Sequence, residues 1–318
     1  MVGSAKVTFK LVSAAALLMA SAYSYAVDCP GGTNFYHTAT GSVSPITTTI
    51  NVVVASNFKD PAEDLADDFV VGTSYQVNLC HGASGTIATS INGGNPYNLS
   101  LFMAADEGYA QDVADGSYGL GDIFLYAYGV PVWYLSPNAY ASNNASAYFF
   151  TGQASGATAE GLTSKVVLKH STGTPNAPTI AIGNIPNAPY GNAANVILGQ
   201  MGLASTSYIY NAGTNVTSAC SGLISGSQWQ CMYSNIDNTL LAIENNAVTG
   251  GFVGWSQVCS KPTARYVKFP DYYTEQYGVL VDVASSAQET VAAAFVSFMN
   301  IGSVGWNSFL TTNCYKPI

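Results

Sequence analysis

The chain contains few charged residues, and very few of them are basic. Lys and Arg number 9 against 18 Asp and Glu, which gives the 318 residues a formal net charge of −9. A protein that binds nucleic acid needs a basic surface to displace counterions from phosphates, so the composition argues against that class of partner. The 48% of hydrophobic residues excludes a long disordered acidic chain, because it supplies ample apolar material for a core.

Long hydrophobic runs are also missing. The apolar run Leu11–Ala20 is too short to cross about 30 Å of hydrocarbon, and no later stretch is long and apolar enough for a transmembrane helix. Lys6 and Lys10 precede this run, and small residues follow it up to Ala26, which is typical of a secretory signal. We expect residues 1–26 to be a signal peptide cleaved near Ala26, and a soluble periplasmic or secreted product.

The sequence lacks the CxxC and HxxxH spacings of common metal sites, so we expect no metal. Its six cysteines all follow the expected cleavage point, and an even number in an exported chain suggests three disulfides among 15 possible connectivities. The local pair Cys220–Cys231 is the favoured one. Cys259–Cys314 and Cys29–Cys80 then follow by elimination.

Short apolar runs alternate with helical segments after a Gly/Ser/Thr-rich stretch, residues 27–47, which we expect to form an extended arm. The predicted strands are Asn51–Ala55, Tyr75–Cys80, Leu99–Met103, Val130–Leu135, Thr179–Ile182, Gly251–Gly254 and Val279–Val283. The predicted helices start at Asp60 and Thr86 or cover Asn192–Met201, Asn238–Asn245 and Ala287–Met299. This alternation predicts an α/β fold, interrupted by polar loops at 137–162 and 203–230.

Two loops between a predicted strand and a predicted helix are rich in small hydrogen-bond donors. They are Ser56–Lys59 and His81–Thr86. Backbone N–H groups at the start of a helix have no intrahelical acceptor, and with nearby hydroxyl or amide side chains they favour an anion. In open α/β sheets such loops meet beyond the carboxyl ends of the strands, where ligands bind.

Enzymatic chemistry has weak support in the sequence. His81 lies three residues before Ser84, as a base might lie near a nucleophile, but no G-x-S-x-G elbow is present. We predict no catalytic residue. A secreted enzyme remains one alternative, and a surface glycan-binding or adhesion protein is another, suggested by the low charge and the many Tyr, Asn and Ser residues.

The order of the segments resembles that of the periplasmic molybdate-binding proteins of ABC importers, within the type II periplasmic solute-binding superfamily. The resemblance rests on VVVASNFKDPAEDLADDF (52–69), the G-A-S-G-T helix start and A-A-D strand end within 81–113, and the segments 181–203, 238–254 and 272–299. It implies an α/β, two-lobed fold in which each lobe is a mixed sheet flanked by helices, with the ligand cleft between the lobes. Lobe 1 would comprise 48–124 plus 257–318 and lobe 2 would comprise 125–256, with crossovers near Leu125 and Ser256.

The same resemblance implies a site without cofactor or metal, in which loop hydroxyls and backbone amides hold a tetrahedral oxyanion. Carried onto this sequence, the ligand-binding positions are Ser56, Asn57, Ser84, Gly85, Tyr190, Ile236 and Trp255. Tyr190 and Ile236 would donate through the backbone. The tyrosine hydroxyl of the family has no clear equivalent, and Val253, Gly254 and Trp255 are the candidates for its place.

As a function, the resemblance implies a monomeric receptor that captures a molybdate- or tungstate-like oxyanion and delivers it to the membrane permease of an ABC importer. Phosphate, sulfate or an organic solute remain alternative ligands. Loss of Lys6 and Lys10 leaves 7 basic against 18 acidic residues, a net charge of −11 that repels anions. Capture must therefore depend on short-range hydrogen bonds, each worth roughly 1.5–3 kcal/mol when charge-assisted.

Overall fold

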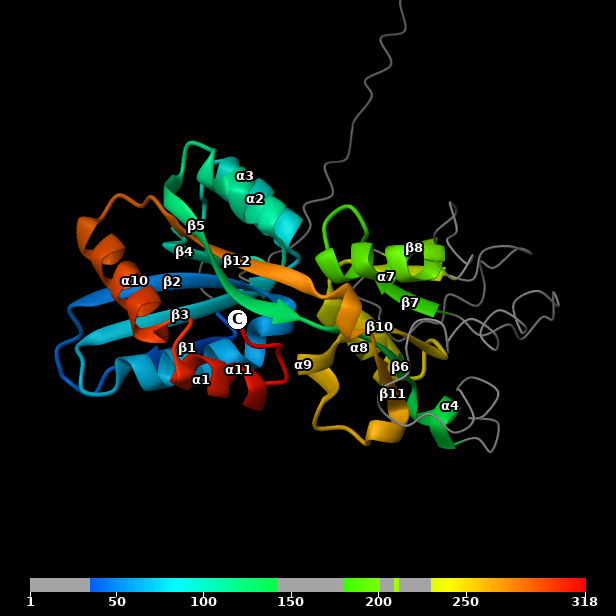
Figure 1. Cartoon of the computed structure of the whole chain (residues 1–318). Helices are drawn as coiled ribbons and strands as arrows, with labels where there is room; N and C mark the ends of the chain where they lie inside the picture. Colours follow the sequence, from blue (N-terminus) through cyan, green and yellow to red (C-terminus); the bar gives the residue numbers. More distant parts are fainter. Residues whose placement is uncertain (1–34, 142–179, 201–208, 212–229) are drawn as a thin grey trace, which may run out of the picture.

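The computed structural model describes residues 35–141, 180–200, 209–211 and 230–318. These residues form two lobes, each built on a six-stranded mixed sheet (Figure 1). The expected signal peptide, residues 1–26, and the first part of the expected arm, residues 27–34, lie outside the described residues. Within the rest of the arm, residues 37–40 form a strand that pairs antiparallel with residues 76–79. Within the described ranges, no helix combines the length and the apolar character needed to span a membrane.

Lobe 1 contains the sheet β1-β3-β2-β4-β12-β5. Its strands are β1 (His37–Thr40), β2 (Thr48–Ala55), β3 (Tyr75–Gly82), β4 (Leu101–Met103), β5 (Gly119–Gly129) and β12 (Thr274–Val281). Its helices are α1 (Lys59–Val70), α2 (Ser84–Asn92), α3 (Glu107–Ala114), α10 (Ser286–Met299) and α11 (Val304–Thr312). A short 3-10 turn, η2 (Ser56–Phe58), joins β2 to α1.

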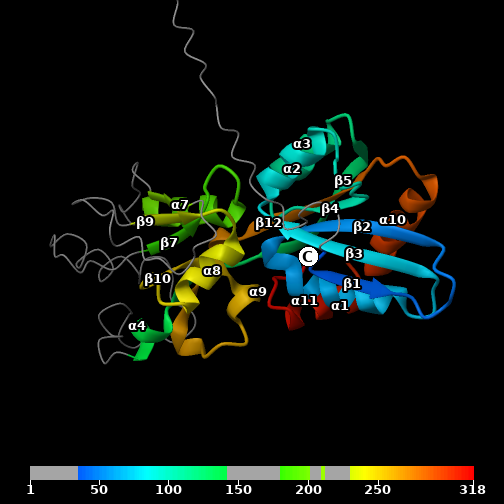
Figure 2. The same cartoon turned by 180° about the vertical axis from the view of Figure 1, so that it is seen from behind.

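The alternation of side chains along β2 explains the layering of lobe 1. Val52 and Val54 pack into the core under α1, α10 and α11, whereas Val53 faces the core under α2 and α3. Successive residues of a strand point to opposite faces, so the apolar run of β2 must be covered on both sides. β2 pairs in parallel with both β3 and β4. The carboxyl ends of all three strands therefore meet at one edge, which faces lobe 2 (Figure 2).

Lobe 2 contains the sheet β11-β6-β10-β7-β9-β8. Its strands are β6 (Pro131–Leu135), β7 (Ile180–Gly183), β8 (Ile209–Asn211), β9 (Gln230–Tyr233), β10 (Gly250–Gly254) and β11 (Tyr266–Lys268). Its helices are α4 (Pro137–Ala141), α7 (Pro189–Gln200), α8 (Ile236–Glu244) and α9 (Trp255–Val258), with 3-10 turns η4 (Thr263–Arg265) and η5 (Pro270–Tyr272). One apolar cluster packs under α8 and another under α7, on opposite faces of the sheet.

The chain passes between the two sheets twice. It leaves the first sheet between Gly129 and Pro131, and it returns between Lys268 and Thr274. We expected these crossovers near Leu125 and Ser256. The difference arises because β5 stays paired with β12 up to Gly129, and because the segment that follows α9 supplies one more strand, β11, to the second sheet.

The α/β fold with two mixed sheets is the one predicted, and each predicted strand or helix has a counterpart within a few residues. Several elements were not predicted, among them β1, β5, β8, β9, β11, α4, α9 and α11. β5 contains three glycines and only a short apolar stretch, and it is held by its partner β12 rather than by its own pattern. Asp106 caps α3 by accepting a hydrogen bond from the Tyr109 N–H at 3.1 Å.

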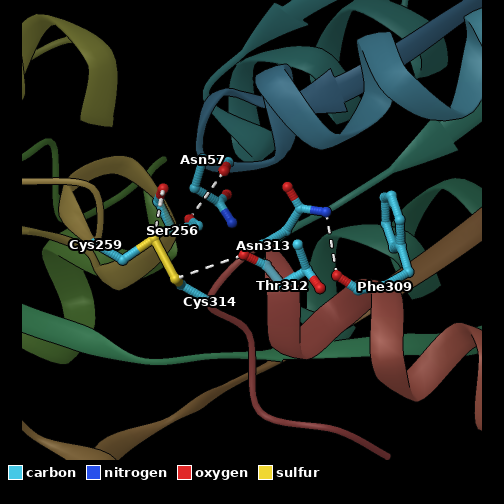
Figure 3. Close-up of a disulfide and its surroundings, with 7 residues drawn as sticks. All are labelled: Asn57, Ser256, Cys259, Phe309, Thr312, Asn313 and Cys314. Atoms are coloured by element: carbon cyan, nitrogen blue, oxygen red, sulfur yellow. Dashed lines mark hydrogen bonds between the residues drawn. A yellow bond between two sulfur atoms is a disulfide. The ribbon is translucent and has the colours of Figure 1, made fainter.

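A disulfide bond joins the two lobes covalently (Figure 3). Cys259 follows α9 of lobe 2 and Cys314 follows α11 of lobe 1, which confirms this predicted pair. Cys80 and Cys231 are disulfide-bonded as well. Their predicted partners, Cys29 and Cys220, lie outside the described residues.

Candidate functional site

A small pocket lies where the two lobes meet, at the carboxyl ends of parallel strands. Four helix starts converge on it, those of η2 and α2 from lobe 1 and those of α7 and α8 from lobe 2. Its lining residues are Ala55, Ser56, Asn57, Gly82, Ala83, Ser84, Ala105, Ala188, Pro189, Tyr190 and Ile236. The cavity volume is about 10 Å³, room for little more than one water molecule, so the lobes are closed tightly around it.

Ser56 and Asn57, at the end of β2, form what we call the Asn57 corner of the pocket. The Asn57 amide nitrogen Nδ2 lies 2.9 Å from the Tyr315 hydroxyl and 3.2 Å from Gln276 Oε1, and it can donate to both. The Asn57 carbonyl accepts from the hydroxyls of Tyr315 and Ser256 at 2.6 and 3.1 Å. Both hydrogens of this amide therefore have acceptors within the protein.

Ser84, Gly85 and Ala105 form the Ser84 corner. The Ser84 hydroxyl is fully buried and accepts from the Ala105 N–H at 3.0 Å, which leaves its own proton to be donated. The Gly85 N–H donates to the Asn187 carbonyl of lobe 2 at 2.9 Å. A Cβ at Gly85 would lie 2.9 Å from the Asn187 Cα, so the absent side chain allows the two lobes to approach this closely.

Tyr190 and Ile236 supply the lobe 2 side of the pocket. Tyr190 is the second residue of α7 and Ile236 is the first residue of α8, so neither backbone N–H has an intrahelical acceptor. Asn235 caps α8 by accepting from the Asn238 N–H at 2.8 Å. The Tyr190 ring is buried, and burial is the main cause that raises the pKa of its hydroxyl above the ordinary value.

Trp255 does not line the pocket. Its ring lies under the Lys268 ammonium, with 3.9 Å between Nζ and the ring centroid, and its backbone N–H donates to the Val130 carbonyl at 2.8 Å. Among the described residues, its buried indole nitrogen has no hydrogen-bond partner. The other six candidates lie at or beside the pocket. Five of them line it: Ser56, Asn57, Ser84, Tyr190 and Ile236. Gly85 lies beside it and joins the lobes through the hydrogen bond from its N–H to the Asn187 carbonyl.

Within the part of the chain that the structure describes, the buried His81 is the imidazole beside the pocket. Its Nδ1 lies 3.1 Å from the Ser56 hydroxyl and 3.3 Å from Asp237 Oδ2. Burial, and next the positive charge of Lys59, lower the pKa of His81 to about 4. In a catalytic triad the serine and the carboxylate contact opposite nitrogens of the ring, whereas here both contact Nδ1, so this group cannot relay a proton as a triad does.

A wider groove adjoins the pocket and shares Ser56 and Asn57 with it. Its volume is about 330 Å³, and its remaining lining residues are Lys59, Asp60, Pro61, Asp237, Leu240, Leu241, Glu244, Ser256 and Gln257. The described residues contain no group of three or more His, Cys, Asp or Glu side chains placed to hold a metal. The pocket itself thus offers uncharged donors, and the mixed charges lie outside it.

Several residues around the site were not among the candidates, and three of them make contacts that matter here. Ala105 lines the pocket at the end of the A-A-D segment, which was noted in the sequence for its resemblance only. Gln276 and Tyr315 bind Asn57 from 219 and 258 residues away. No local pattern could have indicated these two, because their role depends on where the C-terminal strand and tail return to lobe 1.

Comparisons with known proteins agree with this geometry. The sequence profile of the bacterial extracellular solute-binding protein family matches residues 50–301. The molybdate-binding protein ModA of Rhodobacter capsulatus is 25% identical over 248 residues, which cover 77% of this chain and 80% of that protein. ModA of Azotobacter vinelandii is 27% identical over 155 residues, and this match covers 48% of the chain and only about half (51%) of that relative.

The fold is shared with a solved structure too. The periplasmic molybdate-binding protein of Azotobacter vinelandii superposes with a TM-score of 0.61 at 22% identity, over 84% of this chain and 98% of that chain. A two-lobed α/β structure with a small pocket between its lobes is the architecture of a solute receptor. The chain belongs to the bacterial extracellular solute-binding protein family, a family of binding proteins rather than enzymes.

Proposed function

We propose that this protein is the receptor of an ABC importer for a small tetrahedral oxyanion of the molybdate type. The observation that carries the proposal is the convergence of four helix starts and the Ser84 hydroxyl on one pocket between the lobes. Helix starts favour anions because their N–H groups are unpaired and the helix dipole is positive there. Two relatives that match this chain are named as molybdate-binding proteins.

The proposed ligand contacts are the Ser84 hydroxyl and the backbone N–H groups of Ser56, Asn57, Tyr190 and Ile236. All of these are donors. A buried donor left without an acceptor costs about 1–3 kcal/mol, so the set favours an anion whose oxygens only accept. Molybdate, tungstate and sulfate carry no proton at neutral pH, whereas phosphate carries at least one, which would face a donor. The pocket therefore favours the unprotonated oxyanions over phosphate.

A thermal-shift panel on the mature protein tests this function. Molybdate, tungstate, sulfate and phosphate are added separately, and a ligand present at 100 times its dissociation constant adds about 2.7 kcal/mol to the free energy of unfolding. We expect molybdate and tungstate to raise the melting temperature most and phosphate least. The absence of any shift with all four anions, together with binding on a glycan array, would favour the adhesion alternative instead.

We further propose that the chain is exported, loses residues 1–26, and acts as a monomer that presents its closed form to a membrane permease. We propose that the two lobes move about the two crossovers, between Gly129 and Pro131 and between Lys268 and Thr274, rather than at the expected bounds near 125 and 256. Intact-mass measurement of the secreted product checks the cleavage site. Peptide mapping without reductant checks the pairs Cys29–Cys80 and Cys220–Cys231.

A further inference from the structure

A cluster of buried polar side chains lies behind the pocket, centred on Gln276 of β12. Gln276 is completely buried. Its Oε1 accepts from Asn57 Nδ2 at 3.2 Å and from the Tyr126 hydroxyl at 3.0 Å, and its Nε2 donates to the Tyr190 hydroxyl at 3.1 Å. The amide therefore links three side chains, and its loss would leave buried polar groups without partners.

These partners belong to different lobes. Asn57, Tyr126 and Gln276 lie in lobe 1, whereas Tyr190 lies on α7 of lobe 2. The Tyr190 hydroxyl also lies 3.4 Å from Asn57 Nδ2. The bond between Gln276 and Tyr190 is thus a direct contact between the lobes, made by two side chains that are both almost entirely removed from water.

The contact is located at the hinge. Gly129 ends β5 at the first crossover, and β12 begins at Thr274, directly after the second. A Cβ on Gly129 would collide with both the Tyr190 hydroxyl and the Gln276 amide. The Tyr190 side chain therefore reaches from the pocket, where its backbone lies, to the point where the chain crosses between the sheets.

We propose that Gln276 is a positioning residue that holds the Tyr190 hydroxyl at the hinge, and that this bond keeps the lobes closed and the Tyr190 N–H directed at the ligand. Rotation of lobe 2 about the crossovers changes the position of the hydroxyl relative to Gln276, because the two groups are attached to different lobes, and the proposal requires this change to break their bond. Opening would then leave buried polar groups without hydrogen-bond partners or expose them to water. The bond therefore makes the closed form more stable relative to the open form and makes ligand release slower. The effect on ligand release rests on the proposed function, whereas the effect on the shape of the protein does not.

The test compares two tyrosines that bond to the same glutamine. Tyr190→Phe removes the hydroxyl that joins the lobes and keeps the ring and the backbone donor. Tyr126→Phe is the matched control, because within the described residues the hydrogen bonds of the Tyr126 hydroxyl go to the Ala104 carbonyl and Gln276, both in lobe 1. Small-angle X-ray scattering of the ligand-free proteins measures opening, stopped-flow mixing measures the dissociation rate of molybdate, and chemical unfolding measures stability.

For Tyr190→Phe we expect a larger radius of gyration without ligand and a dissociation rate raised about 10-fold, the equivalent of one hydrogen bond of about 1.4 kcal/mol. Tyr126→Phe should lower stability by a similar amount while leaving both the shape and the dissociation rate unchanged. Equal changes in the two variants, or an unchanged Tyr190→Phe, would overturn the proposal.

A second variant covers the case in which Tyr190→Phe folds poorly. Ser256→Ala removes the hydrogen bond of 3.1 Å that the Ser256 hydroxyl of lobe 2 donates to the Asn57 carbonyl of lobe 1. The Tyr315 hydroxyl still donates to the same carbonyl, so folding should tolerate this change. Because the bond between Gln276 and Tyr190 remains in this variant, we expect the lobes to stay closed without ligand, and an opened form would assign closure to the Ser256 contact and overturn the proposal. If no oxyanion binds at all, the proposed function fails, and scattering alone still decides whether the lobes are held in this way.

Discussion

The Asn57 corner and the Ser84 corner follow neighbouring parallel strands of the same sheet, yet they use their side chains differently. At the Ser84 corner the hydroxyl accepts one bond from Ala105 and retains a proton that can be donated into the pocket. At the Asn57 corner the amide is directed at Gln276 and Tyr315 inside the protein. Two loops in equivalent positions at strand ends can therefore serve ligand contact in one case and the closure of the lobes in the other.

The difference has a physical cause in the surroundings of each loop. Ser84 has a short side chain and is the first residue of α2, and the start of this helix borders the pocket. Asn57 is longer, and the C-terminal residues of the chain return beside it to supply acceptors for its amide and donors for its carbonyl. The following predictions test this comparison, from the largest expected effect to the smallest.

Removal of the disulfide that fastens the chain near the Asn57 corner should cost the most stability (Figure 3). The bond between Cys259 and Cys314 closes a separation of 55 residues, which corresponds to about 4 kcal/mol at 25 °C if it acts by restricting the unfolded chain. We expect the Cys259→Ser/Cys314→Ser double variant to unfold at a correspondingly lower denaturant concentration. An unchanged denaturant midpoint would mean that the disulfide adds nothing to the free energy of unfolding beyond the hydrogen bonds around Asn57.

Acid should weaken the Asn57 corner through His81, which contacts Ser56. The folded pKa of His81 is lowered by burial, and next by Lys59, from 6.5 to about 4, so the unfolded chain binds a proton at higher pH than the folded chain. The free energy of unfolding should fall as the pH drops from about 6.5 to about 4, by at most about 3 kcal/mol, since the nearby Asp237 works against the shift.

Urea unfolding across this pH range measures the loss. His81→Asn should remove most of the slope, whereas the matched variant of the more exposed His37, His37→Asn, should keep it. A slope that survives in His81→Asn would assign the acid sensitivity to other groups.

Ser84→Ala should weaken oxyanion binding without a comparable loss of stability. A charge-assisted hydrogen bond contributes roughly 1.5–3 kcal/mol, so the dissociation constant should rise about 10- to 100-fold by titration calorimetry. Ser74→Ala, at a serine that pairs with Thr47 far from the pocket, serves as the control. Unchanged affinity in Ser84→Ala would show that the ligand does not touch this hydroxyl.

Asn57→Ala should give the opposite pattern. Loss of the amide removes one buried hydrogen bond from Gln276 Oε1 and one from the Tyr315 hydroxyl, although Gln276 keeps its bonds to two tyrosines and Tyr315 keeps its bond to the backbone carbonyl of residue 57. We therefore expect stability to fall by about 1–3 kcal/mol, while affinity falls less than in Ser84→Ala. Calorimetry and chemical unfolding on the same two variants measure both quantities. If Asn57→Ala lost more affinity than Ser84→Ala, the amide would be a ligand contact after all and the two corners would be equivalent.

Most of the fold and part of the site could be predicted from local sequence. The apolar run of β2 and the Asp60-Pro61 start placed the first strand and helix within a few residues, because periodicity acts over short distances. The strand-end loops at Ser56 and Ser84 indicated an anion pocket for the same reason. Asp60 itself is not the N-cap: α1 begins at Lys59, and its N-cap Phe58 makes no side-chain capping bond. β5 escaped prediction, since its glycine-rich sequence is stabilised by β12, about 150 residues further on.

The order of strands and helices, the expectation of an export signal and the small donors at two helix starts come from the sequence itself, since each depends on residues that are neighbours in the chain. Only the tertiary structure decided that Trp255 lies outside the pocket, that Cys259 and Cys314 bridge the lobes, and that the Asn57 amide is directed at Gln276. These contacts join residues that are far apart along the chain. Their geometry exists only once both sheets have formed and the crossovers have brought the two lobes together.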